Sequence, residues 1–292
     1  MRKAVVTAGT GGLGLHAAIM LQHKGFAVTV VGRDTAHGEQ AVHRIGEGAR
    51  FLQADLSSIS QVRSLGARLA GEGPLHLLVN NVGGQYSKRW TTADGIEASF
   101  AVNHLSPVVL TRELLGALQA GAPSRVVDVT SSSITILDGA PDYDELEQDG
   151  DYFGMSVTGR AKLAHLAHTQ DLSRRLEGSG VTVLSVDPVG PAAAATPNAA
   201  AMTPELLPPP IRHLWGQIQA GIRPVEECAE IIVAAATDPA FEGKTGVVVG
   251  PDGQPSENLN SYLNPEVAAA ALALTERVLA DLDHGDSAGP LT

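Results

Sequence analysis

The first fourteen residues constrain the fold of this chain more than any other stretch. An apolar run at 4–7 leads directly into a glycine-rich turn and then into a pattern with helical spacing. Gly9, Gly11 and Gly14 let the backbone approach a phosphate without a Cβ in the way, and a helix start offers unpaired N–H groups. The stretch therefore predicts a cradle for the pyrophosphate of a dinucleotide. A turn that serves only tight packing of strand against helix is the alternative.

Length and composition limit the partners. The 292 residues suit one α/β domain, and a net charge of −12 argues against a nucleic acid or an anionic membrane, because both need a basic face. The single cysteine, Cys228, excludes an internal disulfide framework and is expected as a small buried hydrophobe. No signal peptide and no apolar run of about 18 residues is seen. We therefore expect a cytoplasmic protein that binds a small molecule.

Strands and helices alternate along the chain. After the first strand, apolar runs predict strands at 26–31, 50–53, 75–79, 124–130, 181–186 and 246–249, with helical patterns such as 13–24 and 35–46 between them. Alternation at this spacing predicts a parallel sheet with right-handed crossovers. We expect one α/β domain over 1–292, with a doubly wound Rossmann-type sheet of about seven strands.

Side chains at two strand ends predict the cofactor. Arg33 and Asp34 follow the second strand, where a Rossmann-type fold meets the adenosine ribose. Because Arg33 stands nearer the strand, it favours a 2′-phosphate and hence NADP(H) over NAD(H); a solvated loop charge is the alternative. Asp55 follows the third strand, where its carboxylate reaches an adenine amino group. Ser57 or Ser58 can cap the next helix.

Several motifs in fixed order resemble the short-chain dehydrogenase/reductase superfamily, and within it the retinol-dehydrogenase-like branch. They are the glycine turn, the Asp55-Leu56 pair, Asn-Asn-Val-Gly-Gly at 80–84 and the segment 92–105. The likeness extends from about residue 3 to 265. It implies binding of NADP(H) by Gly9, Thr10, Gly12, Leu13, Gly14, Arg33, Asp55, Leu56, Asn81, Gly83, Lys162 and Pro188.

The resemblance also implies the catalytic positions. Asn103 would hold a water of the proton relay, in a helix bent near Pro107. Ser131, at the tip of the fifth strand, would hydrogen-bond the substrate carbonyl, with Ser132 as its nearest rival and strand-end capping as the alternative. Lys162 would hold the nicotinamide ribose and lower the pKa of a tyrosine four residues before it.

Thr158 stands where the family has that tyrosine. Tyr152 lies ten residues before Lys162, and members of the branch commonly carry a second tyrosine six residues before the catalytic one, which is the spacing from Tyr152 to Thr158. We therefore interpret the change as a true loss. An aliphatic hydroxyl is a far weaker acid than a phenol of pKa about 10, so Thr158 can donate a hydrogen bond without being the ultimate proton source.

Later parts of the chain depart further from the family pattern. Val189 replaces the glycine of a Pro-Gly pair, Thr196 lies farther along than the usual threonine, and Ala8 replaces the first glycine of the turn. The segment 191–223 interrupts the alternation and predicts a substrate lid. Its apolar side chains favour a bulky hydrophobic substrate or cover core; they are Met202, Leu206, Leu207, Leu214 and Trp215.

The sequence also predicts the surroundings of two later helices. His165 and His168 fall on a helix expected to begin at Thr158, where surface or interface packing is favoured over a metal site. A terminal helix is expected at 264–281, with a frayed end at 285–292. The resemblance implies a homodimer or homotetramer through the helices near 96–119 and 158–178.

The sequence as a whole predicts an atypical NADP(H)-dependent ketoreductase of secondary metabolism, acting on a hydrophobic, aromatic polyketide-like substrate. The proton would come from a water relay at Asn103 and Lys162 or from a substrate hydroxyl. A non-redox cyclase, dehydratase or isomerase that keeps the nucleotide site as scaffold is the alternative, with Ser131, Lys162 or Asp187 as acid–base groups. A non-catalytic NADP-binding regulator is the third interpretation, since fold alone does not decide function.

Overall fold

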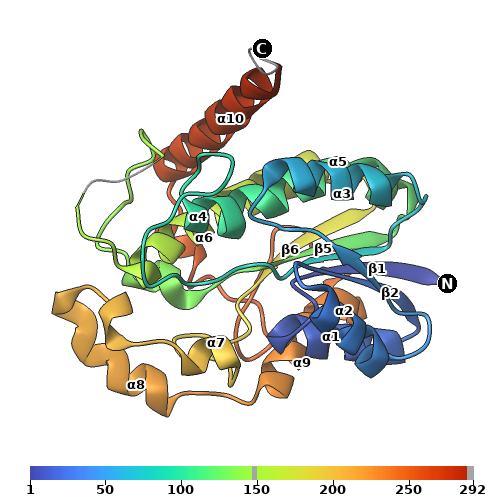
Figure 1. Cartoon of the computed structure of the whole chain (residues 1–292), viewed down its shortest axis with the longest axis horizontal. Helices are drawn as coiled ribbons and strands as arrows, with labels where there is room; N and C mark the ends of the chain where they lie inside the picture. The colour runs from blue at the N-terminus through green and yellow to red at the C-terminus, as the bar shows by residue number, and fades with distance from the viewer. Residues whose placement is uncertain (147–149, 288–292) are drawn as a thin grey trace.

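The computed structural model describes residues 1–146 and 150–287, and its centre is one parallel sheet (Figure 1). Seven strands lie in the order β3-β2-β1-β4-β5-β6-β7, and every neighbouring pair is parallel. They are β1 Arg2–Thr7, β2 Phe26–Gly32, β3 Arg50–Gln53, β4 Leu77–Asn80, β5 Ser124–Val129, β6 Val181–Val186 and β7 Val248–Val249. The doubly wound fold is confirmed. Since the strand order reverses at β1, a crevice opens between the carboxyl ends of β1 and β4.

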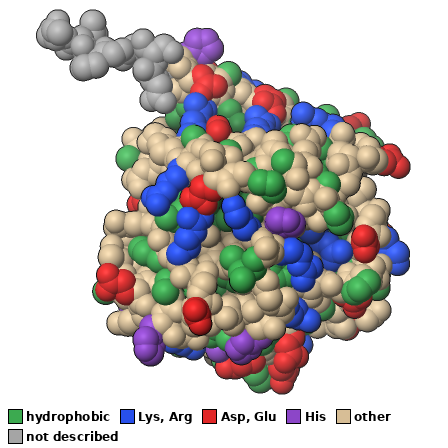
Figure 2. Space-filling view, turned by 90° about the vertical axis from the view of Figure 1, so that its right-hand side faces the viewer, with side chains coloured by type: hydrophobic (Ala, Val, Ile, Leu, Met, Phe, Trp, Pro, Cys, Tyr) green, Lys and Arg blue, Asp and Glu red, His purple; other side chains and the backbone are tan. Residues whose placement is uncertain are grey.

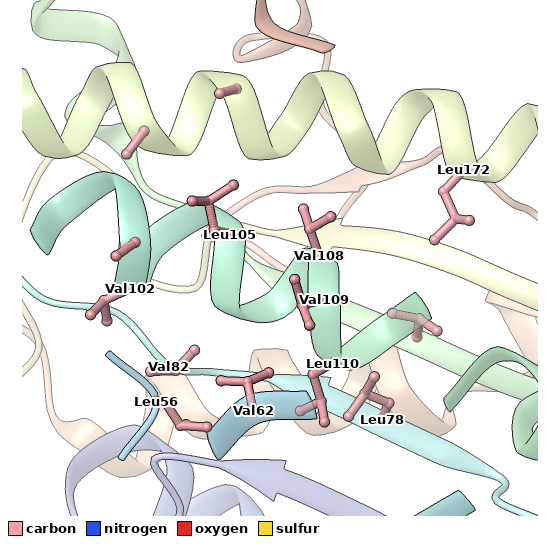
Figure 3. Close-up of a cluster of buried hydrophobic side chains, with 14 of the residues drawn as sticks. Leu56, Val62, Leu78, Val82, Val102, Leu105, Val108, Val109, Leu110 and Leu172 are labelled. Atoms are coloured by element: carbon pink, nitrogen blue, oxygen red, sulfur yellow. The ribbon is translucent and has the colours of Figure 1, made fainter. Parts of the chain in front are cut away.

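Helices cover both faces of the sheet (Figure 1). One layer holds α1 Gly12–His23, α2 Thr35–Ile45 and α9 Val225–Thr237, and the other holds α3 Ile59–Ala70, α5 Ser106–Ala120 and α6 Gly154–Arg175. Figure 3 shows the hydrophobic core between the sheet and the layer of α3, α5 and α6, where Val62 of α3 and Leu110 of α5 meet Leu78 of the sheet. Cys228 lies buried on α9, as expected.

The segment before α5 is irregular. A short α4, Ala98–Phe100, continues into a π-helical turn, Ala101–Leu105, and then into α5 with Pro107 in its first turn. Because proline has no N–H to donate to the preceding turn, the helix is irregular where the sequence predicts a bend. This turn carries Asn103.

Two helix boundaries differ from expectation. α6 begins at Gly154, so Thr158 lies one turn inside it and is buried. The terminal helix, α10, spans Pro265–Ser287, so the end expected to fray at 285–292 is helical as far as 287 and lies outside the described residues after that. α10 packs along α6 and is tied to α5 by the Arg112–Glu276 ion pair.

The expectation that His165 and His168 pack at the surface or an interface is wrong. Both side chains lie inside the fold, 2% and 3% exposed, and His165 Nε2 is 3.4 Å from the buried Asp128 carboxylate. Burial lowers the pKa of His168 to about 3. Burial alone would raise the pKa of Asp128, but His165 and hydrogen bonds from Asn80 and Thr169 outweigh it and hold that pKa at about 2.

The segment 191–223 forms a separate group of short helices at one end of the molecule (Figure 1). These are α7 Pro197–Ala200, two 3₁₀ turns, Pro204–Leu206 and Pro209–Leu214, and α8 Trp215–Ala220. Leu206 and Leu207 are buried in a small apolar cluster with Met155 of α6. Part of this apolar surface therefore covers core, as one of the two sequence interpretations has it.

The outer surface is mixed in charge. On the face seen in Figure 2, basic, acidic and histidine side chains are interspersed with hydrophobic and polar surface. Over residues 1–146 and 150–287, no helix is long and apolar enough to cross a membrane. In that same part of the chain, no cluster of three or more His, Cys, Asp or Glu side chains is placed to hold a metal ion.

Candidate active site

A cavity of about 650 Å³ opens at the carboxyl ends of β1, β2, β3 and β4. Of the residues predicted to bind cofactor, those that line it are Thr10, Gly12, Leu13, Arg33, Asp55, Leu56, Asn81 and Gly83. Gly9, Gly14, Lys162 and Pro188 do not line it. Residues that sequence reasoning did not single out for cofactor binding also contribute: His37, Tyr86, Trp90, Pro197 and Asn198.

The glycines of the turn are needed for two different physical reasons. A Cβ on Gly9 would lie 2.7 Å from Val30 Cγ1, and one on Gly14 would lie 2.5 Å from the Ala8 carbonyl oxygen, so packing requires glycine at both positions. Gly11 lines the cavity and has nothing within 4 Å of a Cβ position. Close packing therefore explains Gly9 and Gly14, whereas Gly11 leaves room for a ligand.

Ala8 and Thr196 show how this chain departs from the family's turn. Ala8 has φ +48°, the left-handed region that glycine adopts more easily, at the position where the family has a glycine. Thr196 lies over the turn, with Cγ2 3.4 Å from a Cβ position on Gly12, and its hydroxyl accepts from Ala199 N to cap α7. The displaced threonine thus still reaches the cavity.

At the β2 end of the cavity, the side chains of Arg33 and Asp34 have different surroundings. Asp34 caps α2 by accepting from His37 N at 2.7 Å, so its carboxylate is engaged by the helix start. Arg33 is exposed and lines the cavity. Asp55, half-buried at the end of β3, accepts from the backbone and hydroxyl of Ser57. The guanidinium is therefore better placed than Asp34 to meet an anionic group.

Asn103 and Thr158 meet at the backbone of Gly84 rather than in the cavity. Asn103 Oδ1 accepts from Gly84 N, and its Nδ2 donates to Gly84 O, both at 3.0 Å, and to Ser99 Oγ at 3.1 Å. Thr158 Oγ1 donates to the same carbonyl at 3.3 Å. Both side chains are buried, at 0% and 3% exposure. They therefore clamp the segment that follows β4.

Lys162 lies directly beneath this segment. Its Nζ donates to Val129 O at 2.7 Å and would be 3.3 Å from a Cβ on Gly83, a residue that lines the cavity. Burial lowers the pKa of Lys162 to about 8, although the Asp128 carboxylate opposes the shift. Two of its three N–H donors remain for groups that enter beside Gly83.

The serines predicted to bind substrate line a second cavity of about 510 Å³. Much of its apolar wall comes from the 191–223 segment, and Ile136, Leu137 and Met155 also contribute; the residues from that segment are Pro191, Leu207, Pro208, Pro210, Ile211, Leu214 and Ile218. Ser131 Oγ accepts from Ser133 N at 3.1 Å, whereas Ser132 Oγ donates to the buried Asp187 carboxylate. Since the proton of Ser132 is engaged, Ser131 is the better donor to a substrate carbonyl.

Comparison with known proteins agrees with this architecture. Residues 2–139 match the family model described as short chain dehydrogenase. Retinol dehydrogenase 12 of Mus musculus is 37% identical over 190 residues, 63% of this chain and 60% of that protein, and retinol dehydrogenase 13 of Homo sapiens is 37% identical over 196 residues, 64% and 58%. The chain thus spans about three fifths of the length of these curated relatives.

Solved structures extend the likeness to most of the chain. A short chain dehydrogenase from Burkholderia cenocepacia in complex with NADP is 25% identical, with a TM-score of 0.65 over 86% of this chain and 96% of that one. A short chain dehydrogenase/reductase family protein is 28% identical, with a TM-score of 0.63 over 85% and 94%. In its motifs, its fold and its relatives, the chain is similar to short chain dehydrogenases.

Proposed function

We propose that this protein is an NADP(H)-dependent oxidoreductase that reduces a ketone on a hydrophobic, aromatic polyketide-like substrate without a tyrosine general acid. The observation that carries the proposal is the pairing of two cavities on either side of segment 83–86. Gly83 and Tyr86 line the cavity that contains Arg33, and Gln85 lines the apolar cavity that contains Ser131.

The residues of the first cavity fit a dinucleotide. Gly11 leaves backbone space at a helix N-terminus, and Arg33 supplies a cation at the tip of β2 for a 2′-phosphate. Structural neighbours of this chain are described as NADP complexes. When bound, the cofactor supplies a hydride to the substrate carbon.

On the protein side, Ser131 donates to the carbonyl oxygen and stabilises the negative charge that develops there. Lys162 holds the ribose beside Gly83 through its two remaining donors. Thr158 is committed to the Gly84 carbonyl and is not the proton source. The proton comes from a hydroxyl of the substrate or from a water that reaches Lys162.

The lid favours a large apolar substrate. Leu207, Ile211, Leu214 and Ile218 face the second cavity, and its volume of about 510 Å³ falls within the range of pockets for drug-sized ligands. An aromatic polyketide ketone has both the apolar surface and the neighbouring phenol that could return a proton to the alkoxide.

The buried Ser132–Asp187 pair favours a second candidate, a non-redox cyclase, dehydratase or isomerase. Asp187 is 4% exposed, and its carboxylate binds Ser132 Oγ and Gly190 N beside the apolar cavity. Through Ser132 this carboxylate could take a proton from a substrate hydroxyl.

The two candidate functions differ in whether NADPH is consumed. The protein is incubated with NADPH and a panel of aromatic polyketide ketones, and NADPH absorbance and product mass are followed together. A product heavier by two hydrogens with matching loss of NADPH supports reduction. An isomer or a dehydrated product with NADPH unchanged supports the second candidate and contradicts the first.

A further inference from the structure

One wall of the cofactor cavity comes from neither the glycine turn nor the strand ends. It is segment 83–90, an irregular stretch after β4, and its Tyr86 and Trp90 line the same cavity as Arg33, His37 and Asp55. The two rings meet edge to face, with centroids 5.6 Å apart and planes at 85°. Trp90 is 37% exposed, so the core does not account for its large apolar ring.

This wall is held in place at both ends. Asn103 binds the backbone of Gly84 on both sides, and the Trp90 carbonyl accepts from Ala98 N at 3.0 Å. Between these points the Tyr86 carbonyl packs on the start of α6, 2.1 Å from where a Cβ on Gly154 would stand. The backbone that carries the aromatic pair is therefore fixed before a ligand arrives.

Electrostatic interactions also link Tyr86 to the charges at the strand ends. Burial raises the pKa of the Tyr86 hydroxyl to about 12, while Arg33 lowers it and Asp55 raises it. Both strand-end charges thus lie within electrostatic reach of Tyr86. The hydroxyl stays neutral at physiological pH and can donate or accept.

We propose that Tyr86 and Trp90 form an aromatic wall against which the purine base of the dinucleotide packs, an assignment that rests on the proposed function. The π-face of a purine matches an exposed indole held at a cavity rim, and stacking of a base on an aromatic side chain needs no hydrogen-bond pattern. Arg33 and Asp55 lie at the same end, where they meet the ribose phosphate and the base edge.

Fluorescence tests the position of the base, because Trp90 and Trp215 are the two tryptophans of the chain. Trp215 belongs to the lid and lines neither cavity described above. In Trp215→Phe, NADPH and 2′,5′-ADP, which carries only the adenosine half, are expected to change the emission of Trp90, whereas nicotinamide mononucleotide leaves it unchanged. In Trp90→Phe, 2′,5′-ADP is expected to leave the emission of Trp215 unchanged.

Calorimetry tests the contribution to affinity. Trp90→Ala is expected to weaken NADPH and 2′,5′-ADP by a similar factor, about 5- to 150-fold for loss of one stacked ring, while Trp90→Phe keeps most of the affinity. Trp215→Ala is the matched control and is expected to bind 2′,5′-ADP like the wild type. Melting temperatures verify that each variant is folded.

The results separate this inference from the function on which it rests. If the wild type binds NADPH and Trp90→Ala binds 2′,5′-ADP with wild-type affinity, the aromatic wall is overturned and the proposed function still stands. A response of Trp90 to nicotinamide mononucleotide in place of 2′,5′-ADP overturns the assignment to the purine. Absence of NADPH binding by the wild type overturns both.

Discussion

The two ends of the proposed site, which we assign to the adenosine and to the reacting groups, are built differently. At the adenosine end, Gly11, Arg33 and Asp55 lie in the turns that follow β1, β2 and β3 and line an open cavity. At the reactive end, Asn103 and Thr158 are buried and bound to one backbone carbonyl. Local sequence order therefore places the first set at a cavity, whereas packing makes the second set support segment 83–86 between the two cavities.

The largest expected effect separates packing from binding within the glycine turn. Gly14→Ala would place a Cβ 2.5 Å from the Ala8 carbonyl oxygen and from Asn81 Nδ2, so overpacking against backbone should cost about 3 kcal/mol of stability or more and lower the melting temperature. Gly11→Ala is the control, with an unchanged melting temperature but weaker NADPH binding. Equal melting temperatures of Gly14→Ala and wild type would contradict the packing role.

Arg33→Ala tests whether Arg33 binds the 2′-phosphate at the adenosine end. Loss of a charge-assisted pair with the 2′-phosphate should cost about 1.5 to 3 kcal/mol of NADPH binding, which is roughly 10- to 150-fold, and leave NADH binding little changed. Titration of both cofactors measures the ratio. Wild-type protein that binds NADH as tightly as NADPH would show that this arginine is a solvated loop charge.

Lys162 is expected to make cofactor binding depend on pH. Its pKa of about 8 means that the ammonium form prevails below pH 8 and is lost above it. Because a charged donor binds a ribose hydroxyl more strongly than a neutral amine, the dissociation constant of NADPH should rise by up to about tenfold between pH 7 and 9. Lys162→Met should bind more weakly at pH 7 and lack this rise; a rise that persists in the variant would assign it to another group.

The smallest expected effect belongs to Thr158. Thr158→Val keeps the side-chain shape and removes one hydrogen bond to the Gly84 carbonyl, which still accepts from Asn103, so turnover should fall only about 2- to 10-fold. Thr158→Tyr should destabilise the fold, because the position is 3% exposed and a larger side chain there would have to displace packed neighbours. A wild-type rate in Thr158→Val together with an inactive Tyr86→Phe or Tyr152→Phe would show that a tyrosine outside the helix supplies the proton.

The sequence by itself determined the alternating strands and helices, the glycine turn, and the placement of Arg33 and Asp55 at strand ends. These features depend on hydrophobic period and on residues adjacent in the chain, so they can be deduced without knowing what packs against them. The same reasoning located α6 but started it at Thr158, because Gly154 is a weak helix signal.

Only the tertiary structure decided which way the side chains of α6 and its neighbours face. Thr158 binds Gly84, 74 residues away, and His165 lies beside Asp128 instead of at the surface. The exposed Trp90 becomes part of a cavity only because Asn103 and Gly154 fix the segment before it. Such choices depend on contacts between segments distant in sequence, where packing, and not local propensity, sets the lower free energy.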